Sequence, residues 1–138
     1  DFARLIQEHP NHPDYRPKAR YLAEEYRIFA EGYPQHAQAP EMLFRAANLQ
    51  ADALGRYGVA AGLFKQLVNT WPEAEQAPRA QFLVGYTFHH QIEDPLAAKE
   101  AYEQFLALYP ESELRPAVED ELAFMESGLD IEALIENQ

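Results

Sequence analysis

Three copies of one apolar pattern lie 38 residues apart in this chain: Tyr26-x2-Phe29-x3-Tyr33-Pro34, Phe64-x2-Leu67-x3-Trp71-Pro72 and Tyr102-x2-Phe105-x3-Tyr109-Pro110. A second proline ladder, Pro40, Pro78 and Pro116, has the same step. A step of this size is typical of helical repeats, in which each unit buries its apolar face only by stacking on a neighbour.

On both sides of this pattern the apolar residues have helical spacing nearly everywhere, and no stretch alternates with period two. Glycines and prolines mark the expected helix ends. We expect helices over about residues 15–32, 40–54, 59–70, 78–91, 95–109 and 113–127. Gly128 should end the last of these, and Asp130 should cap a short final turn over 131–136. The fold class predicted is all-α.

Composition narrows the possible functions. The chain has 138 residues, 47% of them hydrophobic, a net charge of −12 and no cysteine. So acidic a chain is poorly suited to nucleic acid or anionic membrane surfaces, which attract cations. Without cysteine there is no disulfide framework and no thiolate metal site. No apolar run approaches the ~20 residues of a membrane span.

The second helix of each unit resembles that of a tetratricopeptide repeat. Ala60-x3-Phe64 and Ala98-x3-Tyr102 are each followed eight residues later by a proline, as in that motif. Three small residues at one ladder position, which should allow close helix approach, resemble the family's first-helix glycine: Ala47, Gly85 and Ala123. The resemblance implies antiparallel helix pairs in a short right-handed solenoid. The step is 38 rather than 34, and the small residue precedes the alanine by one position more than in the family.

The longer step, with its Tyr-Pro or Trp-Pro endings, is similar to that of envelope tetratricopeptide lipoproteins of bacteria. These include outer-membrane assembly lipoproteins and the periplasmic partner of the Tol–Pal system. The resemblance implies a location in the bacterial periplasm or at the outer membrane, with the cytoplasm as the alternative. The chain opens on Asp1 rather than Met, and we expect that upstream sequence preceded it.

We interpret residues 1–138 as one repeat domain. It comprises a partial repeat over 1–34, repeats over 35–72 and 73–110, and capping helices over 111–138. Phe2, Leu5 and Ile6 copy part of the repeat pattern and would lack their full partners, so the N-terminal end is a candidate surface for self-association.

Candidate catalytic and metal-binding groups are few. His89 and His90 are adjacent, so on an α-helix they would point about 100° apart and chelate poorly. Acidic pairs such as Glu24-Glu25 have polar neighbours and are typical of solvated helix faces. We therefore predict no enzyme, no metal and no cofactor.

The candidate binding surface lies on the first helix of each helix pair. These helices, which we call first-type helices, line the concave side of tetratricopeptide arrays; the second helix of each pair is called second-type. Positions spaced three and four apart form a stripe there, with tyrosine, leucine and phenylalanine as apolar anchors. Its predicted members are Arg45, Asn48, Asp52, Arg79, Leu83, Tyr86, His90, Glu121 and Phe124. A one-residue shift would substitute Phe44, Phe82 or His89, and an ordinary exposed helix face is the alternative.

The function predicted is a non-enzymatic scaffold or adaptor that binds a protein segment in this groove. The alternative is a structural or self-association module of a larger repeat protein, with no separate ligand.

Overall fold

The computed structural model describes residues 15–136 of the chain. Over this range it contains six α-helices, two π-helical segments and no strand, so the all-α prediction is confirmed. The elements in chain order are α2 (Tyr15–Gly32), α3 (Ala39–Asn48), η1 (Leu49–Ala53), α4 (Tyr57–Thr70), α5 (Ala77–Tyr86), η2 (Thr87–Ile92), α6 (Pro95–Leu108) and α7 (Arg115–Glu136).

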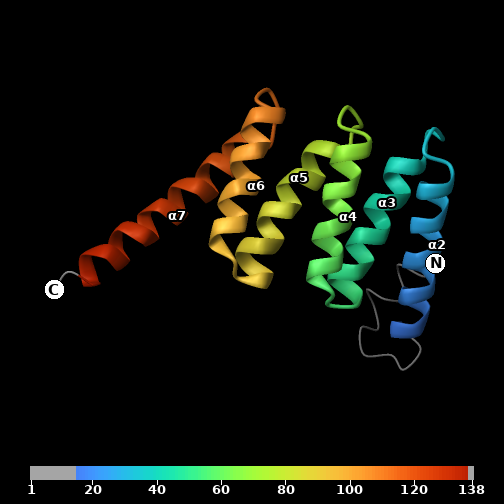
Figure 1. The fold of residues 1–138 in the computed structure, drawn as a ribbon, viewed down its shortest axis with the longest axis horizontal. Helices are drawn as coiled ribbons and strands as arrows, with labels where there is room; N and C mark the ends of the chain where they lie inside the picture. The colour runs from blue at the N-terminus through green and yellow to red at the C-terminus, as the bar shows by residue number, and fades with distance from the viewer. Residues whose placement is uncertain (1–14, 137–138) are drawn as a thin grey trace.

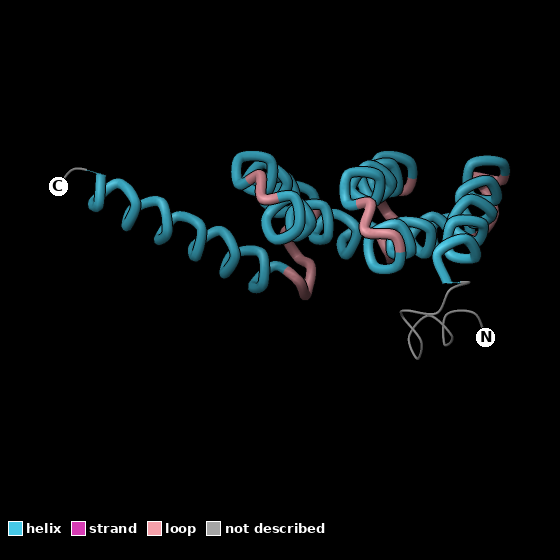
Figure 2. Tube along the Cα trace, turned by 90° about the horizontal axis from the view of Figure 1, so that it is seen from below, coloured by secondary structure: helices cyan, strands magenta, loops and turns pink. Residues whose placement is uncertain are grey.

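Each helix packs against the next one in the chain, from α2 with α3 through to α6 with α7. Figure 1 shows them side by side in one extended row, with α2, α4 and α6 nearer the viewer than α3 and α5. Seen at right angles in Figure 2, the helices fall into two layers. This is the antiparallel helix-pair repeat predicted from the sequence.

The junctions after α2, α4 and α6 share one backbone hydrogen-bond pattern. Tyr33, Trp71 and Tyr109 each donate an N–H to the carbonyl four residues earlier. In each of the three loops, the residue three positions after this aromatic donates its N–H to the carbonyl three residues before it. The residue six positions after the aromatic does the same. The 38-residue step therefore repeats in the backbone as well as in the sequence.

Two of the aromatic residues that precede these prolines, Trp71 and Tyr109, tie consecutive repeats together. Trp71 donates its indole N–H to the carbonyl of Pro34 at 2.8 Å, and the Tyr109 hydroxyl donates to the carbonyl of Pro72 at 2.8 Å. Both bonds run back to the loop of the preceding repeat. The bonds exist because the 38-residue step brings each loop beside its predecessor.

Small residues sit where the helices approach most closely. Ala47, Ala60 and Ala98 have no exposed surface. At Gly85 a Cβ atom would lie 3.0 Å from Cζ of Tyr102 and closer still to two other ring carbons. Ala123, the predicted third member of the Ala47–Gly85 ladder, is instead exposed, because α7 packs on α6 through Val118 and Met125.

Helix α7 corrects the prediction for the C-terminal end. It runs without a break from Arg115 to Glu136, so Gly128 does not end it and no separate final turn follows. Gly55 is the one glycine of the described range with positive φ. Gly128 therefore keeps a helical conformation, which costs about 1 kcal/mol relative to alanine but does not stop a helix. Helix α4 also begins earlier than expected, at Tyr57.

Predictions that involve residues 1–14 lie outside the described residues. The self-association surface at Phe2, Leu5 and Ile6 is among them. The repeat boundaries stay predictions; α3, η1 and α4 fall within 35–72, and α5, η2 and α6 within 73–110.

Candidate functional site

The predicted stripe lies on three consecutive first-type helices: Arg45, Asn48 and Asp52 on α3 and η1; Arg79, Leu83, Tyr86 and His90 on α5 and η2; Glu121 and Phe124 on α7. Most of its side chains are exposed, with Asn48, Leu83 and Glu121 partly buried. Tyr86 is 38% exposed and Phe124 is 70% exposed, so each offers aromatic surface to a partner.

Both first-type helices of the complete repeats end in a π-helical turn. Leu54 donates its N–H to Leu49, five residues back, and Arg56 donates to Gln50 at 2.7 Å. Asp94 makes the same bond to Phe88 at 2.8 Å in the next repeat. A π-turn holds one more residue than an α-turn, which matches the additional position between Ala47 and Ala60.

The chain leaves each π-turn through a left-handed residue. Gly55 has φ +64° and its 38-residue counterpart Glu93 has φ 63°. Glycine adopts this conformation freely, whereas a residue with a Cβ is strained there. Asp94 then caps α6 by accepting the N–H of Ala97 at 3.1 Å.

The structure brings three of the predicted stripe residues into one cluster, together with His89. The rings of Tyr86 and His90 lie 4.5 Å apart between centroids. His90 Nε2 lies 3.3 Å from Glu121 Oε2, and His89 Nδ1 lies 3.1 Å from the same oxygen. Two histidines of η2 therefore converge on one carboxylate of α7; we call His89, His90 and Glu121 the histidine cluster.

Convergence of the two imidazoles corrects the sequence-based geometry. We expected adjacent histidines to diverge by about 100°, but their ring centroids lie 4.1 Å apart. The widened π-turn reduces the angle between successive side chains, because more residues share each turn. In the sequence-based stripe His89 was only a possible substitute after a one-residue shift. The signal that could have revealed it was the additional position between the small residue of the first helix and the alanine of the second.

Other members of the stripe are not brought into this cluster. Arg45 pairs with Glu41 of its own helix at 3.2 Å, and Glu41 also accepts a bond from Gln76 at 2.9 Å. Partial desolvation raises the pKa of the Asp52 carboxyl. Phe44, one of the possible substitutes, belongs to the core, where its ring meets Phe64 edge-on at 5.6 Å.

Tyr102 lies behind the cluster. Like Phe105 it has no exposed surface, as predicted, and its ring meets that of His89 edge-on at 6.3 Å. Its hydroxyl has no hydrogen-bond partner among the described residues. Burial raises the pKa of the Tyr102 phenol, and the nearby Glu121 carboxylate raises it further.

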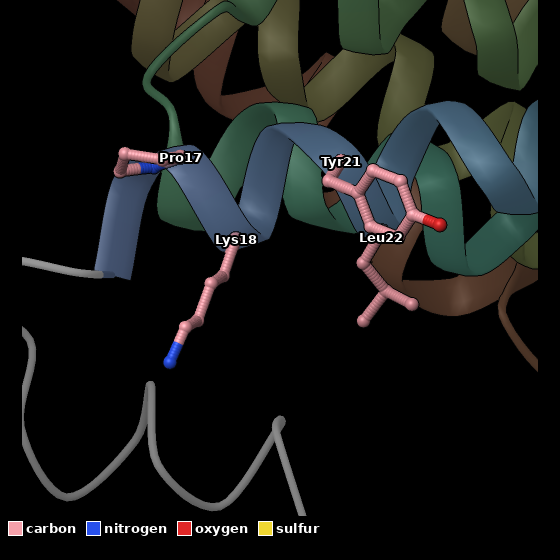
Figure 3. A pocket seen from close by; sticks show the side chains of 4 residues that line it. All are labelled: Pro17, Lys18, Tyr21 and Leu22. Carbon is pink, nitrogen blue, oxygen red and sulfur yellow. The ribbon is translucent and has the colours of Figure 1, made fainter.

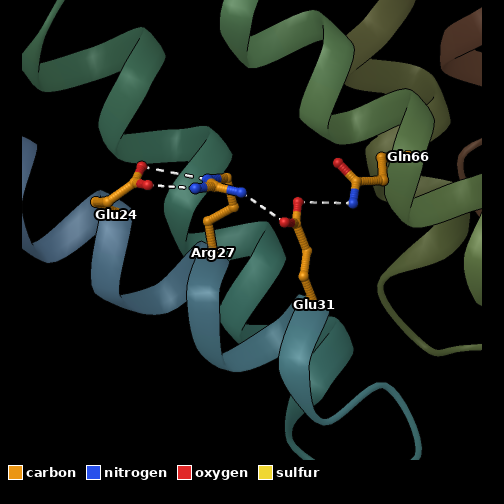
Figure 4. Close-up of polar contacts among 4 residues, drawn as sticks. All are labelled: Glu24, Arg27, Glu31 and Gln66. Atoms are coloured by element: carbon orange, nitrogen blue, oxygen red, sulfur yellow. Dashed lines mark hydrogen bonds and ion pairs between the residues drawn. The ribbon is translucent and has the colours of Figure 1, made fainter.

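The second-type helices carry a different kind of surface. Figure 4 shows Arg27 of α2 between Glu24 and Glu31, with Gln66 of α4 donating to Glu31 at 3.0 Å. This network links two neighbouring helices and lowers the pKa of Glu24 through the Arg27 hydrogen bond. A hollow of about 320 Å³ on α2 (Figure 3) is lined by Pro17, Lys18, Tyr21 and Leu22. Nothing in its lining converges as the histidine cluster does.

The fold defines a helical-repeat protein built from antiparallel helix pairs. Residues 79–112 match the family model described as "Tetratricopeptide repeat", so this stretch is similar to repeats of that family. The match spans α5, η2 and α6, and therefore includes Tyr86 and both histidines of the cluster. Repeats of this family generally mediate protein–protein interaction. No curated protein matches the chain significantly. Within the described residues no helix is both long and apolar enough to cross a membrane.

Proposed function

We propose that this chain is a non-enzymatic scaffold that binds a protein segment along the stripe on α3, α5 and α7. The observation that supports this most directly is the exposed aromatic surface of Tyr86 and Phe124 on first-type helices. A partly exposed aromatic within a polar surround is the residue type that anchors protein partners. The proposal includes a bacterial envelope location, supported by the likeness of the 38-residue step to envelope lipoproteins.

Tyr86 is suited to be the anchor because its environment holds the ring while leaving it accessible. The centroid of its ring lies 6.2 Å from that of Phe82 on α5 and 4.5 Å from that of His90 on η2. A ring restrained on both sides loses little rotamer freedom on binding, which lowers the entropic cost of association. Arg79 and Glu121 supply charged groups of opposite sign on the same stripe for a polar rim.

The test begins with affinity capture from an extract of the source cell, followed by mapping of the bound segment in the captured protein. Binding of that segment is then measured by calorimetry to the parent, Tyr86→Ala and Tyr21→Ala. The expected loss for Tyr86→Ala is ~1–2 kcal/mol, or roughly 5- to 30-fold in Kd. Tyr21 is 68% exposed on α2, away from the stripe, so its variant controls for loss of an exposed tyrosine.

Circular dichroism of both variants checks that they are folded. Unchanged binding by folded Tyr86→Ala would refute the groove assignment. If the parent captures only its own chain, and sedimentation shows concentration-dependent oligomers, the self-association module replaces the scaffold.

A further inference from the structure

We propose that His89, His90 and Glu121 bind a divalent transition-metal ion of the Zn²⁺ type, which links η2 to α7. Neither the family match nor the scaffold function assigns such a site. A test of this metal site does not depend on whether the chain binds a peptide.

The first argument is the convergence of donor atoms. One donor atom from each of the three residues lies within 4.8 Å of the other two. In a tetrahedral zinc site neighbouring donors lie about 3.3 Å apart, since Zn–N and Zn–O bonds are about 2.0–2.1 Å. The His89–Glu121 and His90–Glu121 separations of 3.1 and 3.3 Å already meet that requirement.

The second argument is the way in which the ligands are held. The ring of His90 packs at a tilt of 46° against Tyr86, and His89 meets Tyr102 edge-on, so both imidazoles are restrained by aromatic neighbours. The side chains of His89 and Glu121 are 15% and 26% exposed, and that of His90 is 38% exposed. The cluster is thus preorganised but open to solvent on one side, which gives an ion a path of entry.

The donor set indicates the class of metal. Two imidazoles and one carboxylate suit Zn²⁺ and its transition-metal neighbours, whereas Ca²⁺ and Mg²⁺ prefer sites made of oxygen alone. Three protein ligands leave one tetrahedral position for water. The chain's net charge of −12 favours a cation over an anion at this surface.

Metal binding would have a structural effect. Among the described residues, α7 packs mainly on α6, and Glu121 of α7 contacts η2 through His89 and His90. An ion held by both elements would add a cross-link between two first-type helices, and so fix α7 against the preceding repeat. An ion that binds only the folded state raises its stability by RT ln(1 + L/Kd), where L is the free ion concentration, so the gain increases with metal affinity.

The experiment needs a background from which the other histidines have been removed. His9, His12 and His36 are changed to Gln in the full chain, because the spacing of His9 and His12 also resembles a metal motif. Zn²⁺ affinity is measured by competition with a chromophoric chelator in this background. The same measurement is made after adding His90→Gln or Glu121→Gln, and after adding Glu119→Gln as a control. Glu119 is exposed on the same helix and pairs with Arg115.

We expect one equivalent of Zn²⁺ to bind the background protein and the Glu119→Gln control. Loss of His90 or Glu121 should weaken binding at least ten-fold, since even outer-shell changes cost about 10- to 100-fold. Hydrogen exchange gives a second readout: Zn²⁺ should slow amide exchange over residues 115–125 in the background but not in His90→Gln.

Two results would overturn the site. One is the absence of saturable Zn²⁺ binding below about 1 mM, the weakest affinity of interest. The other is equal affinity in the background and in the folded His90→Gln and Glu121→Gln variants, which would place the ion elsewhere on an acidic surface.

Discussion

Replacing Gly85 with alanine tests the closest helix contact in the repeat. A Cβ at this position would lie 3.0 Å from Cζ of Tyr102 and nearer to Cδ1 and Cε1. Carbon atoms in good contact lie about 3.5–4.0 Å apart, so a fully buried ring would have to move. Overpacking of this kind costs about 1–3 kcal/mol, and alanine returns about 0.8–1.0 kcal/mol through its higher helix propensity. Because the obstacle is a rigid ring, we expect a net loss of about 1–2 kcal/mol.

Gly62 provides the matched control. It lies within α4, and a Cβ there would meet nothing within 4 Å. Gly62→Ala should therefore raise the free energy of unfolding by about 0.5–1 kcal/mol through propensity alone. Urea titration followed by circular dichroism measures both variants. In a Tyr102→Leu background, which lacks the ring, Gly85→Ala should cost much less, as a double-mutant cycle would show. A Gly85→Ala protein as stable as Gly62→Ala would refute the close-contact reasoning.

Two pairs of substitutions test the turns within the repeats and the junctions between them. Glu93→Gly removes the strain of a left-handed non-glycine residue and should raise the free energy of unfolding by up to about 1 kcal/mol. Gly55→Ala, at the counterpart position, should lower the free energy of unfolding. If urea titration showed that both variants change this free energy in the same direction, the argument would be contradicted. Trp71→Phe loses the bond to the Pro34 carbonyl and should lower the unfolding free energy by ~0.5–1.5 kcal/mol. Tyr109→Phe makes the equivalent change one repeat later, and no shift in either melting curve would show that these bonds contribute nothing.

The sequence was sufficient to predict the repeat because the residues that define it act locally or pairwise. Proline and glycine set the helix ends, and the aromatic positions Phe64, Tyr102 and Phe105 are buried as their spacing required. Gly128 misled the prediction because glycine only weakens a helix, and the choice between an end and a continuation depends on its surroundings. Ala123 misled it because, within the described residues, α7 packs mainly on α6 through Val118 and Met125, so the ladder position does not face that contact.

The candidate site was less predictable than the fold, for a physical reason found in η1 and η2. The stripe was drawn with α-helical spacing, and that spacing fails where the backbone widens into a π-turn. Tyr86 comes before the turn in η2, so its exposure followed from the pattern. His89 and His90 lie within it, so the angle between them could not be read from α-helical geometry.

One of the four residues by which this repeat exceeds 34 thus accounts for the wider Ala47–Ala60 spacing and for the main feature of the site. The extra position must be accommodated between the small residue of the first helix and the alanine of the second. The π-turn is where the backbone of both complete repeats absorbs it. In η1 the corresponding positions are Ala51 and Asp52, which cannot form an imidazole pair. The same backbone device is therefore present twice, and only in the second repeat do its side chains converge on a carboxylate of the following helix. Selection for the fold alone would require the turn at both places, but it would not require two histidines and Glu121 to meet at one of them.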